Sequence, residues 1–204
     1  MRRKHPVNGI GIAALVALLG FGAAGTRAQI ASPAPAEVVL KISPDKTTLH
    51  WTVDSALHTV HGTFFLKGGA IHFNPATGDA GGEVVAIATS GQSGNGPRDK
   101  RMHREILETA KYPEVVFRPK HVYGSVSRSG PSDVKVSGTM SIHGADHEMT
   151  AAVHAELTGD HWTGTGKFEV PYITWGMKDP SNFLLKVKPV VNIQLEMAGA
   201  VASQ

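Results

Sequence analysis

The amino-acid sequence predicts an all-β fold of about eight antiparallel strands with one helix inserted between them. From Val38 onward, hydrophobic and polar residues alternate with a period of two, as they do when one face of a sheet is buried and the other is wet. The 23 glycines and 12 prolines supply turns between such strands. The segment 97–109 breaks the alternation and is rich in helix-forming residues.

The first half of the chain predicts short, interrupted strands. Residues 64–73 are expected to form a hairpin, because Gly68 and Gly69 can adopt the positive φ angles of a tight turn. A short apolar strand is expected at 83–89. Val115 and Phe117 begin the next expected strand. Pro119 cannot donate a ladder hydrogen bond, so this strand is expected at a sheet edge or with a bulge.

The second half of the chain alternates more regularly. Four segments each place their apolar residues on one face and their polar residues on the other, namely 134–142, 149–157, 162–170 and 185–197. Each is long enough to cross a sheet, and turn-forming residues separate them. We expect four consecutive antiparallel strands here.

The segment 97–109 predicts one amphipathic helix. Asn95 is a suitable N-cap, and Pro97 fits the first helical turn. Met102, Ile106 and Ala110 recur every four residues and form a narrow apolar stripe. Such a stripe must be buried against another part of the protein.

Strands in this up-and-down order either pack as a sandwich or close into a barrel, and closure removes the exposed edges. An eight-stranded barrel has just enough room for one small ligand. Gly138, Gly164 and Gly166 fall on inward faces. They either leave space inside the barrel or mark bends in a filled core.

The amino terminus predicts export. Residues 1–28 combine basic residues at 2–4 with an apolar stretch and small residues before the expected cleavage point, as in a secretory signal peptide. The apolar stretch is short for a membrane span, although an uncleaved anchor is the alternative. Residues 29–36 read as a flexible linker, which leaves 37–204 as the folded domain. We therefore expect a periplasmic or secreted protein.

The basic character of the chain belongs to this export segment. The formal net charge is +3, from 20 basic and 17 acidic residues, and four of the basic residues lie within 1–28. The rest of the chain has a net charge of −1, so nothing suggests electrostatic binding of nucleic acid. The chain has no cysteine, which excludes disulfides, thiolate metal sites and a cysteine nucleophile.

Four short motifs, in this order, resemble those of the YceI-like family. They are WTVD at 51–54 with His58 and GTF at 62–64, RDKRMH at 98–103, YPEVVF at 112–117, and VSGTMSIHG at 136–144. The resemblance extends over roughly 46–197. One departure is that only seven residues separate Asp54 from Gly62, so the first hairpin is expected to be shorter than in many family members.

The resemblance implies a lipocalin-like antiparallel β-barrel whose open end is covered by the helix. It also implies a periplasmic or secreted protein that binds a long polyisoprenoid or related amphiphile in the barrel. We therefore expect a carrier or sequestering protein for an isoprenoid-like or other amphiphilic lipid, and we expect no cofactor. The inward-facing apolar residues are the expected barrel wall, although an ordinary filled core is the alternative. These residues are Phe64, Leu66, Ile71, Phe73, Phe117, Met140, Ile142, Met149, Val153, Phe168 and Leu195.

The helix is expected to cover this barrel. Met102 and Ile106 would act as a lid over the cavity. Arg98 and Arg101 lie near the positive end of the helix and would contact a polar headgroup or give transient membrane contact. The alternative is that these arginines belong to a solvated helix face.

Histidine suggests a second function, a metal-binding or stress-related module with a filled barrel. His58 is three residues from His61, and His143 lies near Asp146 and His147 in an expected tight turn. Imidazole and carboxylate groups suit zinc or copper. Because the spacing matches no established zinc motif, we expect no metal site.

Catalytic motifs are lacking in the sequence. The glycine-rich stretch 90–94 contains serine and glycine without the spacing of a nucleophile elbow. No glycine-rich stretch carries the lysine of a phosphate-binding loop. A hydrolase that acts on an amphiphile is therefore only a further alternative, and we expect no enzyme activity.

Overall fold

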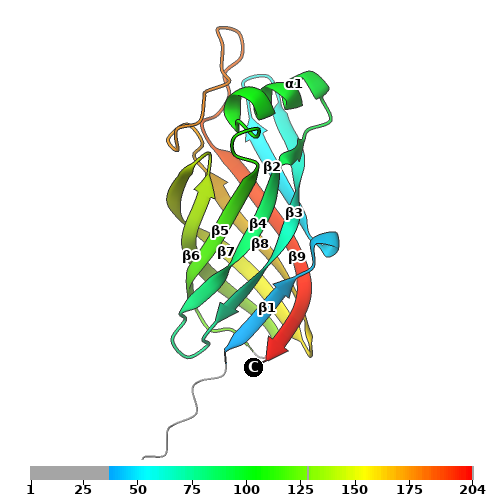
Figure 1. Ribbon diagram of the computed structural model, residues 1–204, viewed down its shortest axis with the longest axis vertical. Helices are drawn as coiled ribbons and strands as arrows, with labels where there is room; N and C mark the ends of the chain where they lie inside the picture. Colours follow the sequence, from blue (N-terminus) through cyan, green and yellow to red (C-terminus); the bar gives the residue numbers. More distant parts are fainter. Residues whose placement is uncertain (1–36, 128, 204) are drawn as a thin grey trace, which may run out of the picture. The chain divides into compact units, whose positions relative to one another are not determined.

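Within the described residues, the chain forms nine β-strands that wrap around a central axis, with a short helical segment at one end (Figure 1). The structure is a computed structural model that describes residues 37–127 and 129–203. The predicted signal peptide 1–28 and linker 29–36 lie outside these residues. None of the described helices is both long and apolar enough to cross a membrane.

The elements follow one another along the chain with mostly short connections. The strands are β1 (Val38–Ile42), β2 (Thr48–Asp54), β3 (Thr59–Phe73), β4 (Ala80–Gln92), β5 (Glu114–Tyr123), β6 (Gly130–Ile142), β7 (Ala145–Thr158), β8 (His161–Val170) and β9 (Val191–Ser203). A 3-10 turn, η1 (Pro44–Lys46), separates β1 from β2. The helical segment is α1 (Gly96–Arg101) followed by the π-helical η2 (Met102–Ile106).

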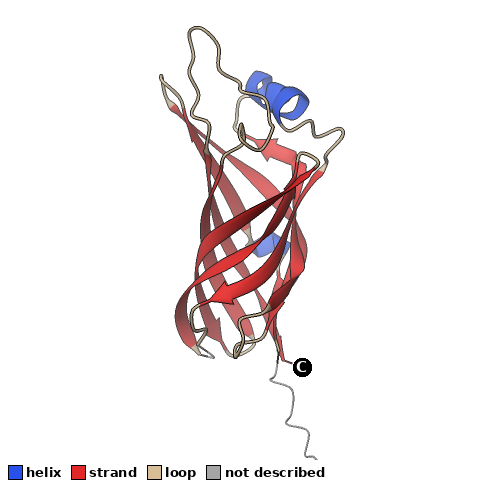
Figure 2. Cartoon of the chain, turned by 90° about the vertical axis from the view of Figure 1, so that its left-hand side faces the viewer, coloured by secondary structure: helices blue, strands red, loops and turns tan. Residues whose placement is uncertain are grey.

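The sheet closes on itself as an antiparallel barrel, which confirms the predicted fold class (Figure 2). Both β1 and β2 pair with β3 on one side and with β9 on the other. Ile42 of β1 lies opposite Gly69, whereas Leu49 of β2 lies opposite Phe64, further along β3. The two strands therefore fill one position in succession, and the barrel has eight positions, as expected from the sequence.

The predicted hairpin at 64–73 is wrong, because β3 runs straight through this segment as a strand of 15 residues. Gly68 and Gly69 have φ angles of 140° and 154°, and the register with β4 shifts next to Gly68. A Cβ atom on Gly69 would lie 2.3 Å from the carbonyl oxygen of Glu83. The glycines thus form a bulge that lets β4 approach closely, instead of reversing the chain.

Other strand boundaries also differ from those expected. The predicted strand 83–89 is the middle of the longer β4. The predicted strand 185–197 begins only at Val191, because local hydrogen bonds fold residues 181–187 back on themselves within the loop 171–190. The prediction for Pro119 is confirmed, since the register of β5 with β6 shifts between Pro119 and His121.

The helical segment is shorter than the predicted 97–109. Asn95 caps it as expected, because its side-chain oxygen accepts a hydrogen bond from the Arg98 N–H group at 3.1 Å. In η2 the Leu107 N–H group donates to the Met102 carbonyl oxygen, which makes a wider turn. This turn brings Leu107 to the barrel, whereas Ala110, predicted to continue the apolar stripe, is exposed beyond the helix.

Candidate ligand-binding cavity

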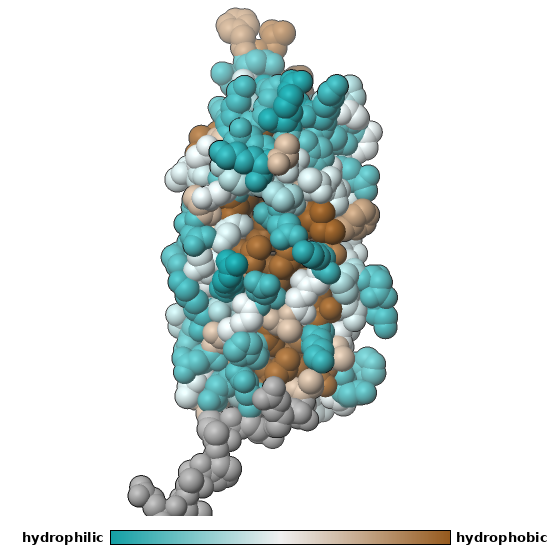
Figure 3. Space-filling view, viewed as in Figure 1, coloured by the Kyte–Doolittle hydropathy of each residue, from teal (hydrophilic) through white to brown (hydrophobic). Residues whose placement is uncertain are grey.

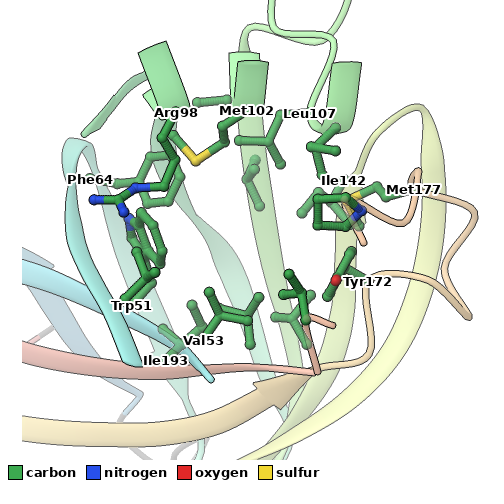
Figure 4. Close-up of a pocket in the computed structure, with 18 of the residues that line it drawn as sticks. Trp51, Val53, Phe64, Arg98, Met102, Leu107, Ile142, Tyr172, Met177 and Ile193 are labelled. Carbon is green, nitrogen blue, oxygen red and sulfur yellow. The ribbon is translucent and has the colours of Figure 1, made fainter. Parts of the chain in front are cut away.

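A cavity of about 340 Å³ lies inside the barrel beneath the helical segment, and we call it the upper cavity (Figure 4). Figure 4 shows Arg98, Met102 and Leu107 extending from α1 and η2 above Val53 and Ile193. Most other lining side chains are apolar residues of the strands and of the loop 171–190. Cavities that hold small molecules commonly measure about 300–1,000 Å³, so this one has a suitable size.

A second cavity of about 150 Å³ lies further down the barrel, and we call it the lower cavity. Leu40, Phe73 and Trp162 line it toward the end opposite the helix. The indole N–H group of Trp162 donates to the Lys41 carbonyl oxygen at 3.0 Å, which anchors the ring at that end. The two cavities adjoin, since they share the wall residues Leu49, Ala86, Val115, Met140 and Phe168.

Every predicted wall residue lines at least one of these cavities. Phe64 and Ile142 line the upper cavity, and Met140 and Phe168 line both. The others line the lower cavity: Leu66, Ile71, Phe73, Phe117, Met149, Val153 and Leu195. The filled-core alternative does not describe the barrel interior, but the contact of these residues with a ligand stays a prediction.

The three inward glycines have different roles. A Cβ atom on Gly138 would lie 2.8 Å from the Phe117 ring and 2.3 Å from the Arg118 carbonyl oxygen. The Phe117 ring therefore occupies the space next to Gly138. At Gly164 a Cβ atom would be less crowded, 3.2 Å from the His154 carbonyl oxygen and 3.3 Å from the Trp162 ring. At Gly166 the nearest atoms to such a Cβ lie at 3.7 Å or more, and this residue lines the lower cavity. Only Gly166 therefore leaves space inside the barrel.

The helical segment lies over the upper cavity. The predicted lid residues Met102 and Ile106 both line the cavity. A Cβ atom on Gly91 of β4 would lie 2.9 Å from the Met102 methyl group, so this glycine makes room for the lid. The His103 ring donates to the Gly91 carbonyl oxygen at 2.8 Å and ties η2 to β4.

The two predicted headgroup residues also line the upper cavity. The Arg98 guanidinium donates to the hydroxyl and carbonyl oxygens of Ser93, at 2.8 and 3.1 Å. Arg101 lies 3.5 Å from the Glu105 carboxylate. Each arginine is thus held at the cavity mouth by a neighbour, and headgroup contact stays a prediction.

Trp51, Tyr172 and Met177 are among the wall residues that were not predicted. Trp51 was visible as an inward residue of a strand, whereas Tyr172 and Met177 lie in the loop 171–190, where no periodicity marks an inward side chain. The Trp51 indole nitrogen and the Tyr172 hydroxyl are both buried, and neither has a hydrogen-bond partner in the described structure. A buried polar group without a partner costs about 1–3 kcal/mol.

The burial of Tyr172 also affects its ionisation. Burial, followed by the nearby Asp179 carboxylate, raises the pKa of Tyr172 from 10.0 to about 12. The hydroxyl therefore stays protonated and available as a donor at neutral pH. Trp51 and Tyr172 thus each contribute a buried donor without a partner to the mostly apolar wall of the upper cavity.

The histidine pairs do not assemble a metal site. His143 lies 2.7 Å from the Glu108 carboxylate, and Asp146 instead accepts a hydrogen bond from Ser141. His147 stacks on Trp175, with ring centroids 4.4 Å apart. Among residues 37–127 and 129–203, no three histidine or acidic side chains are grouped as metal ligands.

Solved structures similar to this barrel include proteins from three organisms. *Burkholderia cenocepacia* BcnA has a TM-score of 0.65 at 13% identity, and the match covers 78% of this chain and 99% of that one. A polyisoprenoid binding domain from *Saccharophagus degradans* has a TM-score of 0.61 at 15% identity, with 79% and 98% covered. The *Campylobacter jejuni* YCEI protein has a TM-score of 0.54 at 18% identity, with 69% and 84% covered.

At these identities the solved structures show a shared fold. A comparison with curated protein sequences finds no match. The sequence pattern of the YceI-like domain, in contrast, matches residues 40–198, which span the barrel from β1 to β9. The chain therefore belongs to the YceI-like family.

Proposed function

We propose that this protein binds an amphiphilic lipid of the isoprenoid class inside its barrel, as a carrier or sequestering protein. The observation that carries the proposal is the apolar upper cavity, which continues toward the lower cavity past five shared wall residues. The similar *Saccharophagus degradans* structure, described as a polyisoprenoid binding domain, supports this class of ligand.

The shape and chemistry of the barrel interior suit an extended apolar tail. Burial of apolar surface contributes about 25 cal/mol per Å² and requires no directional partner. Met140 and Phe168 border both cavities, and the flexible thioether of Met140 adapts to different tail shapes. A tail that enters beneath the lid would extend from the upper into the lower cavity.

The polar atoms of the upper cavity suit the head of such a molecule. The Trp51 indole N–H and the Tyr172 hydroxyl are donors without partners, and the Arg98 guanidinium lies at the mouth. A head with oxygen acceptors would satisfy these donors and recover the cost of their burial. This arrangement supports an amphiphile in preference to a pure hydrocarbon, and a binding function in preference to catalysis.

The site of action is proposed from the amino terminus. Residues 1–28 have the composition of a secretory signal peptide, so the protein would act in the periplasm or outside the cell. A lipid with a long apolar tail is poorly soluble there, and a barrel that encloses the tail would keep it in solution.

The proposal is tested by native mass spectrometry of the exported protein, followed by solvent extraction of any bound lipid. Ala88→Phe places a ring in the upper cavity, which Ala88 lines from β4. Ala152→Phe is the matched control, because Ala152 is exposed on β7. We expect co-purified lipid with the wild type and with Ala152→Phe, and loss of the lipid with folded Ala88→Phe.

Three results would contradict the proposal. The first is a folded, exported wild-type protein with no lipid-sized additional mass. The second is equal lipid retention by the two phenylalanine variants, which would place the lipid outside the barrel. The third is a bound metal ion in place of lipid, which would favour the histidine-based alternative.

A further inference from the structure

Three large apolar side chains are exposed at the helix end of the barrel, and we call them the apolar tip. They are Leu57, Phe183 and Leu184, with exposed fractions of 74%, 96% and 82%. The loop 171–190 rises beyond α1 in Figure 1, and hydrophobic side chains stand at this extremity of the molecule in Figure 3. Exposed apolar clusters of this kind mark interaction sites.

The two loops that carry the apolar tip are joined to each other. The Ala56 N–H group donates to the Lys186 carbonyl oxygen at 2.8 Å, and Ser55 forms a β-bridge with Val187. The Lys188 ammonium lies 3.0 Å from the Asp54 carboxylate. Leu57 and the pair Phe183-Leu184 are therefore presented by one connected surface.

Several backbone groups near the apex of the loop 171–190 form hydrogen bonds within the loop. The Asn182 side-chain oxygen accepts hydrogen bonds from the N–H groups of Leu184 and Leu185, at 2.9 and 2.8 Å. The Asn182 N–H group donates to the Leu185 carbonyl oxygen, and the Val187 N–H group donates to the Ser181 hydroxyl. These polar groups therefore need no water, which suits a loop that enters an apolar medium.

Charge is distributed unevenly between the helix end of the barrel and the rest of the protein. The segments 54–58, 93–113, 143–144 and 171–190 form the helix end, and they contain eight lysines and arginines against five acidic residues. The rest of the chain from residue 29 contains eight basic and twelve acidic residues. The apolar tip thus stands within a positive region, whereas the remainder of the protein is negative.

The apolar tip is continuous with the upper cavity. Pro180, Leu185 and Val187 belong to the same loop and line the cavity wall. Phe183 and Leu184 point to solvent next to them. The loop 171–190 therefore carries both the exposed side chains Phe183 and Leu184 and part of the cavity wall.

We propose that the apolar tip docks this protein on an anionic phospholipid bilayer, with Leu57, Phe183 and Leu184 inserted at the boundary between headgroups and acyl chains. Aromatic and aliphatic side chains insert at this depth, and the positive region attracts anionic headgroups. A second copy of the chain is a poorer occupant, because it would bring two positive ends face to face. In the docked orientation the cavity mouth faces the bilayer. Docking itself is independent of the proposed function, whereas an exchange of lipid between the bilayer and the cavity rests on it.

The inference is tested by co-sedimentation of the exported protein with vesicles. The vesicles contain either phosphatidylcholine alone or phosphatidylcholine mixed with phosphatidylglycerol. The test variant combines Phe183→Ser with Leu184→Ser, and the control is Phe65→Ser, which changes an exposed phenylalanine on β3. We expect the wild type and the control to bind the anionic vesicles, and the double variant to bind at least tenfold more weakly.

Equal vesicle binding by the double variant and the wild type would overturn the inference, as would the absence of wild-type binding to anionic vesicles at low salt. Sedimentation velocity without vesicles gives a further check: a wild-type dimer that the double variant loses would identify a second copy as the occupant. Lipid content is measured on the same preparations. If the protein retains lipid but does not bind vesicles, docking is refuted and the proposed function stands. If it binds vesicles but contains no lipid, the proposed function is refuted and docking stands.

Discussion

The ammonium group of Lys178 lies 3.3 Å from the carboxylate of Glu105, so the loop 171–190 is tied to η2 above the upper cavity. Glu105 also accepts a hydrogen bond from Arg104. The hydrogen bond from Arg104, followed by that from Lys178, lowers the pKa of Glu105 from 4.5 to about 2. The two elements that cover the cavity therefore share one carboxylate, which must be ionised to hold them together.

This relationship predicts that acid loosens the cover of the cavity. Because the pKa of Glu105 is lower in the folded state, its stabilising contribution is present above the ordinary value of 4.5 and is lost as the pH falls toward about 2. Amide hydrogen exchange in 96–107 should accelerate over this range, after correction for intrinsic rates. Glu105→Gln should show fast exchange at every pH. Glu156→Gln on β7 is the control, and an acid response identical in the two variants would contradict the prediction.

The inward glycines Gly138 and Gly166 predict opposite effects of alanine. Gly138→Ala forces a Cβ atom against the Phe117 ring and the Arg118 carbonyl oxygen, so we expect a loss of about 1–3 kcal/mol in unfolding free energy. Gly166→Ala meets only ordinary contacts and should be neutral, or stabilising by up to about 1 kcal/mol. Urea unfolding measures both, and equal losses would show that the space at Gly166 is absent in solution.

Tyr172→Phe is expected to stabilise the empty protein and weaken its hold on lipid. The hydroxyl is buried without a partner, so its removal should raise the unfolding free energy by about 1 kcal/mol. The same change deletes a donor for the ligand head, so less lipid should co-purify. Tyr123→Phe is the control, because Tyr123 is exposed. Unchanged lipid retention in Tyr172→Phe would remove this hydroxyl from the proposed head site.

The same tyrosine predicts an alkaline transition. The pKa of Tyr172 is about 12 in the folded protein, against 10.0 ordinarily, so unfolded chains release this proton first. Titration of Tyr172 therefore leaves the unfolding free energy unchanged below pH 10.0 and lowers it as the pH rises toward about 12. Alkaline unfolding followed by circular dichroism should show a less steep loss of stability in Tyr172→Phe than in the wild type.

Phe168→Ala is expected to widen the junction between the upper and lower cavities. Replacing a buried phenylalanine by alanine costs about 3–5 kcal/mol, and the lower value applies here because Phe168 already borders empty space on two sides. The distribution of co-purified lipid masses should shift toward longer tails. Phe65→Ala is the control on the outer surface, and an unchanged distribution in Phe168→Ala would show that this ring does not limit tail length.

Much of the barrel was predictable because its signals are local. The alternation along β6, β7 and β8 determines which side chains face inward, since successive residues of a strand point to opposite faces. Asn95 and Pro119 are local as well: one caps a helix and the other cannot donate in a ladder. The predicted wall residues on these strands followed from this alternation.

The loop 171–190 shows where local signals end. Its segment 185–190 alternates like a strand, yet the side-chain oxygens of Ser181 and Asn182 accept hydrogen bonds from its N–H groups and fold it into a projecting loop. Tyr172 and Met177 reach the cavity from this loop, and no sequence period marks them as inward residues. Local signals were also insufficient at Gly68 and Gly69, because glycine permits both a turn and a bulge.

The sequence by itself determined which strand residues face inward to form an apolar wall, and where the single capped helix begins. Each of these features depends on neighbours a few residues apart. The tertiary structure decided whether the interior is filled. Whether a glycine such as Gly138 or Gly166 leaves space depends on a side chain from another strand. It also decided that Lys178 meets Glu105 and that Ala56, next to Leu57, is hydrogen-bonded to the loop 171–190, since the closure of the barrel brings these segments together.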